Sequence, residues 1–269
     1  MIAEIGGQRF QWGARTYLMG IVNATPDSFS GDGIGGDSDA AVEQGLRMVR
    51  EGADMLDVGG ESTRPGHVPV TAEEEIARTE RSVQRLARQS GVPVSIDTYK
   101  LEVAEAAVAA GATILNDVWG LTRSPAMADL AARVSCALVL MHNQDGTEYA
   151  GDLMEEVKRF LGASVRRAVD AGVAKEKVIV DPGIGFGKTA DQSWEVMRRF
   201  AELRDLGQPI LVGTSRKSFI GKLLDLPVTE RLEGTAATVV AAILRGADVV
   251  RVHDVLPMAR AARVADRMR

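Results

Sequence analysis

The feature that most constrains the fold is a phrase that occurs three times, each time where a helix-like segment gives way to an apolar run. It reads "EGADMLDVGG", "AGATILNDVWG" and "RGADVVRVHD", starting at positions 51, 110 and 245. The glycine of each phrase (Gly52, Gly111, Gly246) suits the left-handed residue just past a helix end. The apolar run after it is typical of a strand buried on both faces. The chain therefore repeats one helix-to-strand junction.

Eight segments have the character of such a strand, and helical patterns separate them. The strand segments begin at Tyr17, Met55, Val92, Ile114, Cys136, Val178, Pro209 and Val249. The helical patterns include two expected capping boxes, one formed by Thr71 with Glu74 and one by Thr189 with Gln192. Eight such units in 269 residues predict an α/β fold of the (β/α)₈ TIM-barrel type. A doubly wound open sheet would have fewer strands and a glycine fingerprint after the first.

The N-terminal residues form a separate short pattern. "IAEI" and "QRFQW" flank the pair Gly6 and Gly7, which predicts a β-hairpin that closes the barrel bottom. Residues 1–269 are expected to make up a single barrel domain.

The stretch "DPGIGFGKT" from Asp181 to Thr189 looks at first like a nucleotide-binding loop, but its spacing is wrong. The first glycine of such a loop would fall at Pro182, which has no backbone N–H for a phosphate. A dinucleotide fingerprint would need a glycine where Lys188 stands. Lys188 is instead expected to be a solvated residue at the start of a helix.

Composition excludes several classes of protein. Hydrophobic residues make up 45%, charged residues 26%, and the net charge is −5, which is typical of a globular protein and gives no support for a nucleic-acid partner. No stretch approaches the length of a membrane span and the first residues lack the pattern of an export signal, so a cytoplasmic location is expected. Cys136 lies in an apolar run, where a buried small hydrophobe is expected.

Polar residues stand where nearly every predicted strand ends. Taken singly, each has a structural explanation: Asn116 or Asp117 as a helix cap, His142 as a core histidine, Lys217 as a solvated lysine. Their joint placement at the face where barrel enzymes build their sites favours a functional interpretation. The set is Asn23, Glu61, Asp97, Asn116, His142, Asp181, Lys217, Arg251 and His253.

The chemistry of this set indicates the ligand. Asp97, Asn116, Asp181 and Lys217 offer carboxylates, an amide and an ammonium, which suit a flat heterocycle with N–H donors and a carbonyl. Arg251 and His253 join "TSRKS" at the last two strands, where barrels commonly bind phosphate. A polar ring bearing phosphate is therefore expected.

Metal ligands are sparse in this sequence. The histidines are His67, His142 and His253, and no His-x-His pair ends an early strand, so a protein-caged transition metal is not expected. Mg²⁺ held mostly by substrate phosphates, with one oxygen from Asn23, remains compatible with the pattern.

Long motifs in order along the chain resemble the dihydropteroate synthase family over nearly the full length. They are "MGIVNATPDSFSGDG", "DVGGESTRPG", "SIDTYK", "ILNDV", "VDPGIGFGKT", "VGTSRKSFIG" and "RVHDV". The resemblance implies condensation of 6-hydroxymethyl-7,8-dihydropterin pyrophosphate with p-aminobenzoate to dihydropteroate and pyrophosphate, with Mg²⁺ as cofactor. It also implies a homodimer.

The resemblance further assigns roles to residues. It implies catalytic roles for Lys217, Asp97, Arg251 and Asp32. It implies pterin binding by Asp97, Asn116, Asp181, Lys217, Arg251 and Met141, pyrophosphate binding by Asn23, Arg64, Arg251 and His253, and metal binding by Asn23. It implies p-aminobenzoate binding by Thr63, Arg64, Pro65, Phe186, Lys217 and Ser218.

One loop departs from the family pattern. The family often has Asp-Ser-Phe-Ser-Asp-Gly-Gly, whereas "DSFSGDG" puts Gly31 where the aspartate stands and Asp32 one position later. The role of the Asp32 carboxylate toward a developing cation is therefore open.

Two other functions remain as alternatives. A pterin-dependent methyltransferase shares this kind of barrel, but "ESTRPG" and "SRKS" suit a second substrate and a pyrophosphate that it would not use. A non-catalytic pterin-binding protein would be expected to have lost some of the residues assigned above. Ordinary sensitivity to sulfonamides is expected, because the loops at Thr63 to Pro65 and Phe186 carry no obvious insertion.

Overall fold

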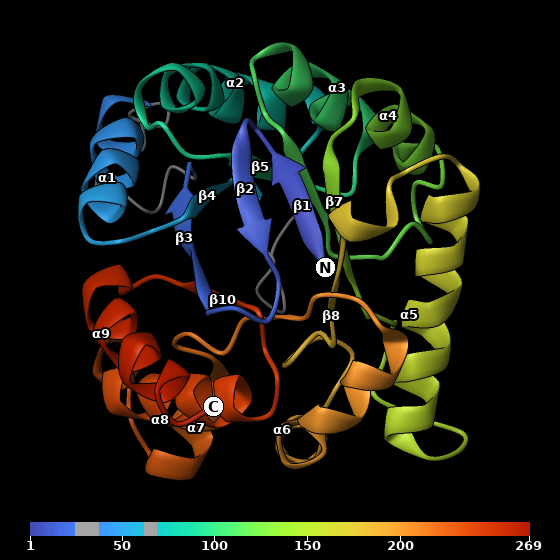
Figure 1. Ribbon diagram of the computed structural model, residues 1–269, viewed down its shortest axis with the longest axis vertical. Helices are drawn as coiled ribbons and strands as arrows, with labels where there is room; N and C mark the ends of the chain where they lie inside the picture. The colour runs from blue at the N-terminus through green and yellow to red at the C-terminus, as the bar shows by residue number, and fades with distance from the viewer. Residues whose placement is uncertain (25–37, 62–68) are drawn as a thin grey trace.

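Eight parallel strands surround the centre of the molecule in the computed structural model, which describes residues 1–24, 38–61 and 69–269 (Figure 1). Their order around the ring is β8-β7-β6-β5-β4-β3-β10-β9. A parallel bridge between Val180 and Ile210 joins the two ends of this row. The strands are β3 (Tyr17–Asn23), β4 (Met55–Gly59), β5 (Val94–Asp97), β6 (Ile114–Asp117), β7 (Ala137–Met141), β8 (Val178–Asp181), β9 (Leu211–Val212) and β10 (Val249–Val252).

Helices follow the strands along the chain and lie outside the ring, as Figure 1 shows. The α-helices are α1 (Ser38–Arg50), α2 (Ala72–Gln89), α3 (Leu101–Ala109), α4 (Met127–Val134), α5 (Leu153–Asp170), α6 (Ala190–Arg198), α7 (Ser218–Leu224), α8 (Leu232–Leu244) and α9 (Val255–Asp266). Short 3₁₀ helices are η2 (Lys175–Lys177), η3 (Phe200–Leu206) and η4 (Val228–Glu230). The main hydrophobic core lies between the helices and the outward side chains of the strands, such as Leu56, Ile96 and Leu138. The predicted (β/α)₈ barrel is therefore confirmed.

Local signals in the sequence explain the element boundaries. Both predicted capping boxes are present: Thr71 and Glu74 cap α2, and Thr189 and Gln192 cap α6. The junction glycines at 52, 111 and 246 have φ of +110°, +111° and +104°, which only glycine adopts readily.

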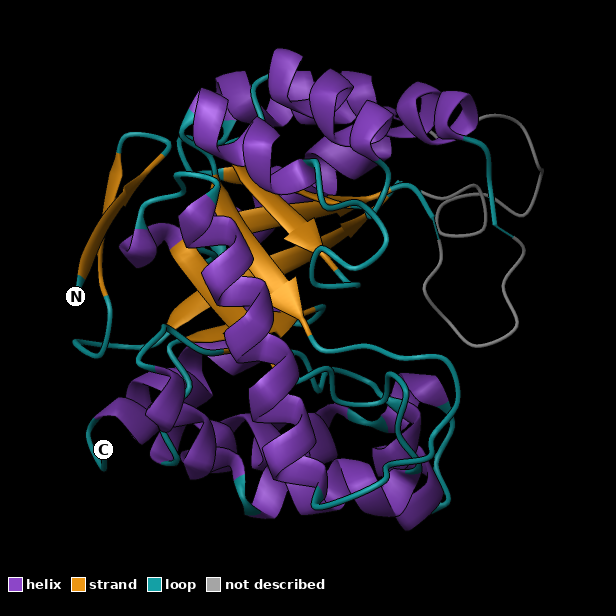
Figure 2. Ribbon diagram, turned by 90° about the vertical axis from the view of Figure 1, so that its right-hand side faces the viewer, coloured by secondary structure: helices purple, strands orange, loops and turns teal. Residues whose placement is uncertain are grey.

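A two-stranded hairpin covers one end of the barrel. It consists of β1 (Ile2–Ile5) and β2 (Gln8–Gln11), paired antiparallel, with Gly6 and Gly7 at positive φ in the turn. Figure 2 shows the hairpin at the left of the molecule, beside one end of the strands. Its buried side chains form a second hydrophobic cluster with the inward residues at the strand beginnings: Ala3, Ile5, Phe10, Trp12, Tyr17, Met19, Met55, Ile114, Ala137, Val139, Ile179, Leu211 and Val249.

Two further expectations can be compared with the structure. Cys136 is a free, buried cysteine. Among the described residues, no helix has both the length and the apolar character that a bilayer crossing requires.

Candidate active site

Polar side chains form a layer directly beyond the hydrophobic cluster inside the barrel. Side chains of a strand alternate between its two faces, so the residue two positions after an inward apolar side chain also points inward. Asp57 follows Met55 in this way, Asn116 follows Ile114, and Asp181 follows Ile179. The same step along the neighbouring strands adds Met141 after Val139 and Arg251 after Val249. The carboxyl ends of the strands therefore share one polar layer.

Arg251 lies at the centre of the charge pairing in this layer. Its Nε is 2.6 Å from Asp57 Oδ2, and its Nη2 is 2.7 Å from Asp97 Oδ2. Asn116 Nδ2 donates to the same Asp57 oxygen at 3.0 Å. One network of ion pairs and hydrogen bonds therefore joins β4, β5, β6 and β10.

The second oxygen of each carboxylate is left for another partner. Asp57 Oδ1 and Asp97 Oδ1 are buried and have no hydrogen-bond partner among the described residues. A buried acceptor without a donor is costly, so a ligand that brings N–H groups to these oxygens gains binding free energy. This arrangement fits a nitrogen-rich ring.

Lys217 and Asp181 form the opposite side of the layer. Lys217 Nζ donates to the Ile184 carbonyl and lies 4.4 Å from the centroid of the Phe186 ring. Burial lowers the pKa of the Lys217 ammonium to about 8, and the neighbouring Asp181 carboxylate opposes that shift. Burial also raises the pKa of Asp181 above its ordinary value, against the effects of Lys217 and of a hydrogen bond from Gly183 N.

Asp97 has a raised pKa for a similar reason. Burial is the largest cause, Arg251 opposes it, and the nearby Asp57 carboxylate adds to it. The site therefore holds ionisable groups whose charges depend on one another and on any ligand that enters.

The loops after the last two strands are tied together beside this layer. His253 N and its Nδ1 both lie within hydrogen-bond distance of Ser215 Oγ, at 3.1 and 3.0 Å. Arg216, which has φ of +59°, pairs with Asp254 through Nε at 2.9 Å and Nη2 at 2.6 Å. These contacts fix Lys217 relative to Arg251 and His253.

The structure brings together most of the residues named from the sequence. Asp97, Asn116, Met141, Asp181, Lys217 and Arg251 belong to the polar layer. Phe186 and His253 stand in the loops after β8 and β10, and Ser218 is the first residue of α7. Asn23 is the last residue of β3 and is half-buried. Asp32, Thr63, Arg64 and Pro65 lie outside the described residues, as does His67.

Two residues keep the structural explanations that the sequence allowed for them, and a third has a different place from the one expected. His142 is buried behind the polar layer and packs against Phe160, with ring centroids 4.9 Å apart, so the core interpretation holds for it. Asp117 accepts hydrogen bonds from Trp119 N and Leu121 N and holds the turn after β6. The expectation of a solvated Lys188 is wrong, because its Nζ contacts His142 Nδ1 and the carbonyls of Gly183 and Phe186, and the residue is only 7% exposed.

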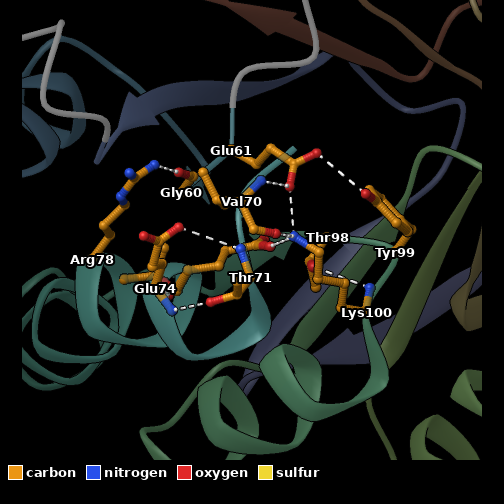
Figure 3. Close-up of polar contacts among 11 residues, drawn as sticks. Gly60, Glu61, Val70, Thr71, Glu74, Arg78, Thr98, Tyr99 and Lys100 are labelled. Carbon is orange, nitrogen blue, oxygen red and sulfur yellow. Dashed lines mark hydrogen bonds and ion pairs between the residues drawn. The ribbon is translucent and has the colours of Figure 1, made fainter. Parts of the chain in front are cut away.

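A second cluster of charges stands where β4 ends, as Figure 3 shows. Lys100 Nζ donates to Glu61 Oε2 at 2.5 Å, to Glu75 Oε2 at 2.6 Å and to the Val70 carbonyl at 2.8 Å. Val70 N donates to Glu61 as well. The cluster therefore holds Glu61 and Val70, which stand on either side of residues 62–68, against α2.

Sequence reasoning missed two of these residues. Asp57 lies inside its strand rather than after it, and the signal that would have found it is a single acid in the apolar run "MLDVGG". Lys100 stands in the motif "SIDTYK", but its partners come from two other elements of the chain.

Comparison with known proteins identifies the family. A family model described as "Pterin binding enzyme" matches residues 19–253. Dihydropteroate synthase of Clostridium beijerinckii is 51% identical to this chain over 264 residues, which are 98% of each protein. The chain belongs to the dihydropteroate synthase family.

Solved dihydropteroate synthases share its fold closely. The enzyme from Clostridium difficile, determined in the presence of pteroic acid, has a TM-score of 0.94 and 50% identity, covering 96% of this chain and 98% of its own. The Xanthomonas albilineans dihydropteroate synthase with 4-aminobenzoic acid has a TM-score of 0.93 and 41% identity, covering 99% and 97%.

Proposed function

We propose that this protein is a dihydropteroate synthase. It joins 6-hydroxymethyl-7,8-dihydropterin pyrophosphate to p-aminobenzoate and releases 7,8-dihydropteroate and pyrophosphate. The observation that carries the proposal is the buried polar layer beside Arg251 and Asn116, in which two carboxylate oxygens have no donor among the residues that the structure describes. Membership of the dihydropteroate synthase family over nearly the whole chain supports the same conclusion.

The pterin ring would lie across the polar layer. Its N–H groups suit the acceptors of Asp97 and Asp181, and its carbonyl suits donors such as Lys217 and Asn116. Arg251 and Met141 would border the ring. Because the layer is buried, each matched hydrogen bond contributes more than it would in water.

Phe186, Lys217 and Ser218 would contact p-aminobenzoate. The Phe186 ring and the Lys217 ammonium lie beside each other, which offers an aromatic face next to a cation for a ring that carries a carboxylate. Thr63, Arg64 and Pro65 are also proposed to contact p-aminobenzoate.

The pyrophosphate would bind at the ends of β3 and β10. His253 and Arg251 stand on the same strand end, and Asn23 ends the adjacent β3. Arg64 is proposed as a further pyrophosphate ligand, and Asp32 is proposed to act on the developing cation. The donor set fits a magnesium ion that is held mainly by substrate oxygens, because Asn23 offers one amide oxygen and the described residues contain no group of three or more potential metal-binding side chains. Bound Mg²⁺ would neutralise charge on the leaving pyrophosphate.

The reaction needs positioning and charge stabilisation more than a strong base. As pyrophosphate leaves, positive charge develops on the pterin methylene and spreads into the ring, and the buried carboxylates Asp57, Asp97 and Asp181 favour that charge. The amino group of p-aminobenzoate then attacks the methylene carbon, for which the site must hold both rings in contact.

We also propose that two copies associate in the cytoplasm. Large apolar side chains are exposed on α7, η4 and α8: Leu223 (66%), Leu224 (45%), Val228 (41%), Leu232 (38%) and Leu244 (44%). Contiguous exposed apolar surface is typical of a protein interface, and Leu223, Leu224 and Val228 lie close together along the chain. Sedimentation of the wild-type protein and of a Leu223→Lys variant would test this, with a monomeric wild type as the contrary result.

One assay tests the proposed activity against the alternatives. Pyrophosphate release from the pterin pyrophosphate is measured with Mg²⁺, with and without p-aminobenzoate, and the product is identified by mass. Release that depends on p-aminobenzoate and gives dihydropteroate is the expected result. Pterin binding without condensation would instead favour a methyltransferase or a binding protein.

A further inference from the structure

Lys188 is a buried lysine that the proposed chemistry does not use. Burial lowers the pKa of its ammonium to about 7, and the Asp181 carboxylate opposes that shift. Its Nζ lies 2.8 Å from His142 Nδ1 and donates to the Gly183 and Phe186 carbonyls, each at 3.1 Å. Three acceptors match the three N–H groups of an ammonium. A charge is costly to bury, so a buried lysine with every donor satisfied indicates a specific role.

The protonation of His142 follows from these contacts. Burial, together with the Lys188 charge, lowers the pKa of His142 to about 3, so the ring is neutral near pH 7. Where Lys188 is protonated, the neutral ring accepts from its ammonium through Nδ1, which leaves the ring proton on Nε2. The ring is held in place by Phe160 and by Tyr149, whose centroid is 6.0 Å away.

Both carbonyls that Lys188 binds belong to one turn. Phe186 N donates to the Gly183 carbonyl at 3.0 Å, so Gly183 and Phe186 are the ends of the turn. The turn lies directly on β7, because a Cβ at Gly183 would stand 2.0 Å from the His142 carbonyl oxygen. Gly183 N also donates to Asp181 Oδ1 at 2.7 Å.

This turn presents groups to the polar layer from one side. It carries the Phe186 ring and the Ile184 carbonyl that contacts Lys217, and through Gly183 N it orients the Asp181 carboxylate. The turn contains Gly183 and Gly185, both at positive φ, so its backbone has little intrinsic rigidity. The hydrogen bonds from Lys188 to the Gly183 and Phe186 carbonyls restrain both ends of this turn.

We propose that Lys188 is a positioning residue of the proposed synthase reaction, whose buried ammonium holds the turn from Gly183 to Phe186 and, through it, Asp181 and Phe186. The inference rests on the proposed function. The groups that face Lys188 are His142 from the end of β7, Asp181 from β8 and Lys217 from the loop before α7. The ammonium also favours the charged form of Asp181.

The test compares Lys188→Met with Lys175→Met, which changes an exposed lysine in η2 at a distance from the polar layer. The expected result for Lys188→Met is a KM for p-aminobenzoate about 10- to 100-fold higher, since charged hydrogen bonds to the turn are lost, with a kcat that changes less than about threefold. Lys175→Met should match the wild type. Equal KM values for the two variants would overturn the proposal.

A pH profile separates this role from a purely structural one. Loss of the nearby cation raises the pKa of Asp181, so binding of 6-hydroxymethylpterin, followed by fluorescence, should weaken at a higher pH in Lys188→Met than in the wild type when the pH is lowered. A structural defect alone would lower affinity equally at every pH, and that result would also count against the proposal.

The partner of Lys188 provides an independent pair of variants if Lys188→Met does not fold. His142→Asn retains an acceptor near Nδ1, whereas His142→Leu does not, so only His142→Leu should raise the KM for p-aminobenzoate. Identical KM values for these two variants would contradict the inference. If the wild type itself makes no dihydropteroate, the proposed function fails, and the pterin-binding pH profile still tests Lys188.

Discussion

Arg251 is the residue on which the charge balance at the strand ends depends. Its guanidinium pairs with Asp57 and Asp97, and each carboxylate keeps one buried oxygen that no donor from the described part of the chain reaches. Breaking one partner of such a buried pair leaves the other charge uncompensated, which costs more than the pair itself contributes. Substitutions in this network should therefore affect ligand binding strongly.

Asp57→Asn removes one of these charges with little change in size. We expect the dissociation constant for 6-hydroxymethylpterin to rise about 10- to 100-fold, because the charge that pairs with Arg251 is lost and the second carboxylate oxygen, the proposed acceptor for the ligand, is no longer anionic. Fluorescence titration measures the constant. Asp39→Asn, at an exposed position in α1, serves as the control. Unchanged pterin affinity in Asp57→Asn would show that this carboxylate is not needed.

The pH dependence of the reaction should reflect Lys217. Burial lowers the pKa of its ammonium to about 8, so the charged form is present below that pH and is lost as the pH rises through it. If the charged form is required, kcat/KM should fall about tenfold per pH unit above roughly pH 8. Lys217→Arg keeps its charge and should lose this decline, although its activity is lower. A rate that stays constant up to pH 9.5 in the wild type would be the contrary finding.

The residues that sequence reasoning found and those it missed differ in one physical respect. Asp97, Asn116 and Asp181 stand at the ends of their strands, and parallel strands bring such positions together whatever the side-chain details. Lys188 gave no such signal, because its partner His142 is 46 residues away and their contact depends on how two loops pack. Asp57 was missed because it lies within β4 and not at its end. It points inward because side chains alternate between the two faces of a strand.

At the scale of elements, the cluster in Figure 3 is the clearest case of a charge holding separate segments together. Lys100 precedes α3, Glu61 follows β4 and Glu75 lies in the first turn of α2. Glu75 is almost fully buried, and burial raises the pKa of its carboxyl despite the Lys100 ammonium. The cap of α2 was predictable from "TAEE", whereas this three-element cluster has no local sequence signature.

Lys100→Met should destabilise the protein by about 3–5 kcal/mol, since it removes the cation that the buried carboxylates of Glu61 and Glu75 share. Chemical denaturation measures the free energy of unfolding. Lys158→Met is a matched control, because Lys158 pairs with Glu155 and Asp205, which are 67% and 71% exposed, and its loss should cost under about 1 kcal/mol. Similar losses for both variants would argue against a special role for the cluster.

At the scale of the whole molecule, the two ends of the barrel have separate tasks. One end is filled by the hairpin cluster, in which Phe10 lies 4.9 Å from Tyr17 and 5.4 Å from Trp12 between ring centroids. The other end carries the polar layer. The eight-unit order was predictable because each unit repeats the same periodicity, and the barrel follows from that order by the known handedness of strand crossovers.

Phe10→Ala should therefore affect stability and not catalysis. Removing a buried ring at the hairpin is expected to lower the free energy of unfolding by about 3–5 kcal/mol. The Michaelis constants of both substrates should stay within about twofold of the wild type, measured at a temperature where the variant is folded. Gln8→Ala, in the same hairpin but exposed, is the control. A large rise in either constant would mean that the two ends are coupled.

The closing of the ring between β8 and β9 has a consequence for how the protein responds to its substrate. β9 has two residues, and the Val180 to Ile210 bridge and the hydrogen bond from Val180 N to the Pro209 carbonyl join it to β8. Asp181 ends β8 and Lys217 follows β9, so a pterin bound as proposed would contact both sides of this seam. Pterin binding should then stabilise the pairing of β8 with β9. The rate of amide hydrogen exchange in β9 should fall as the fraction of protein with bound pterin rises.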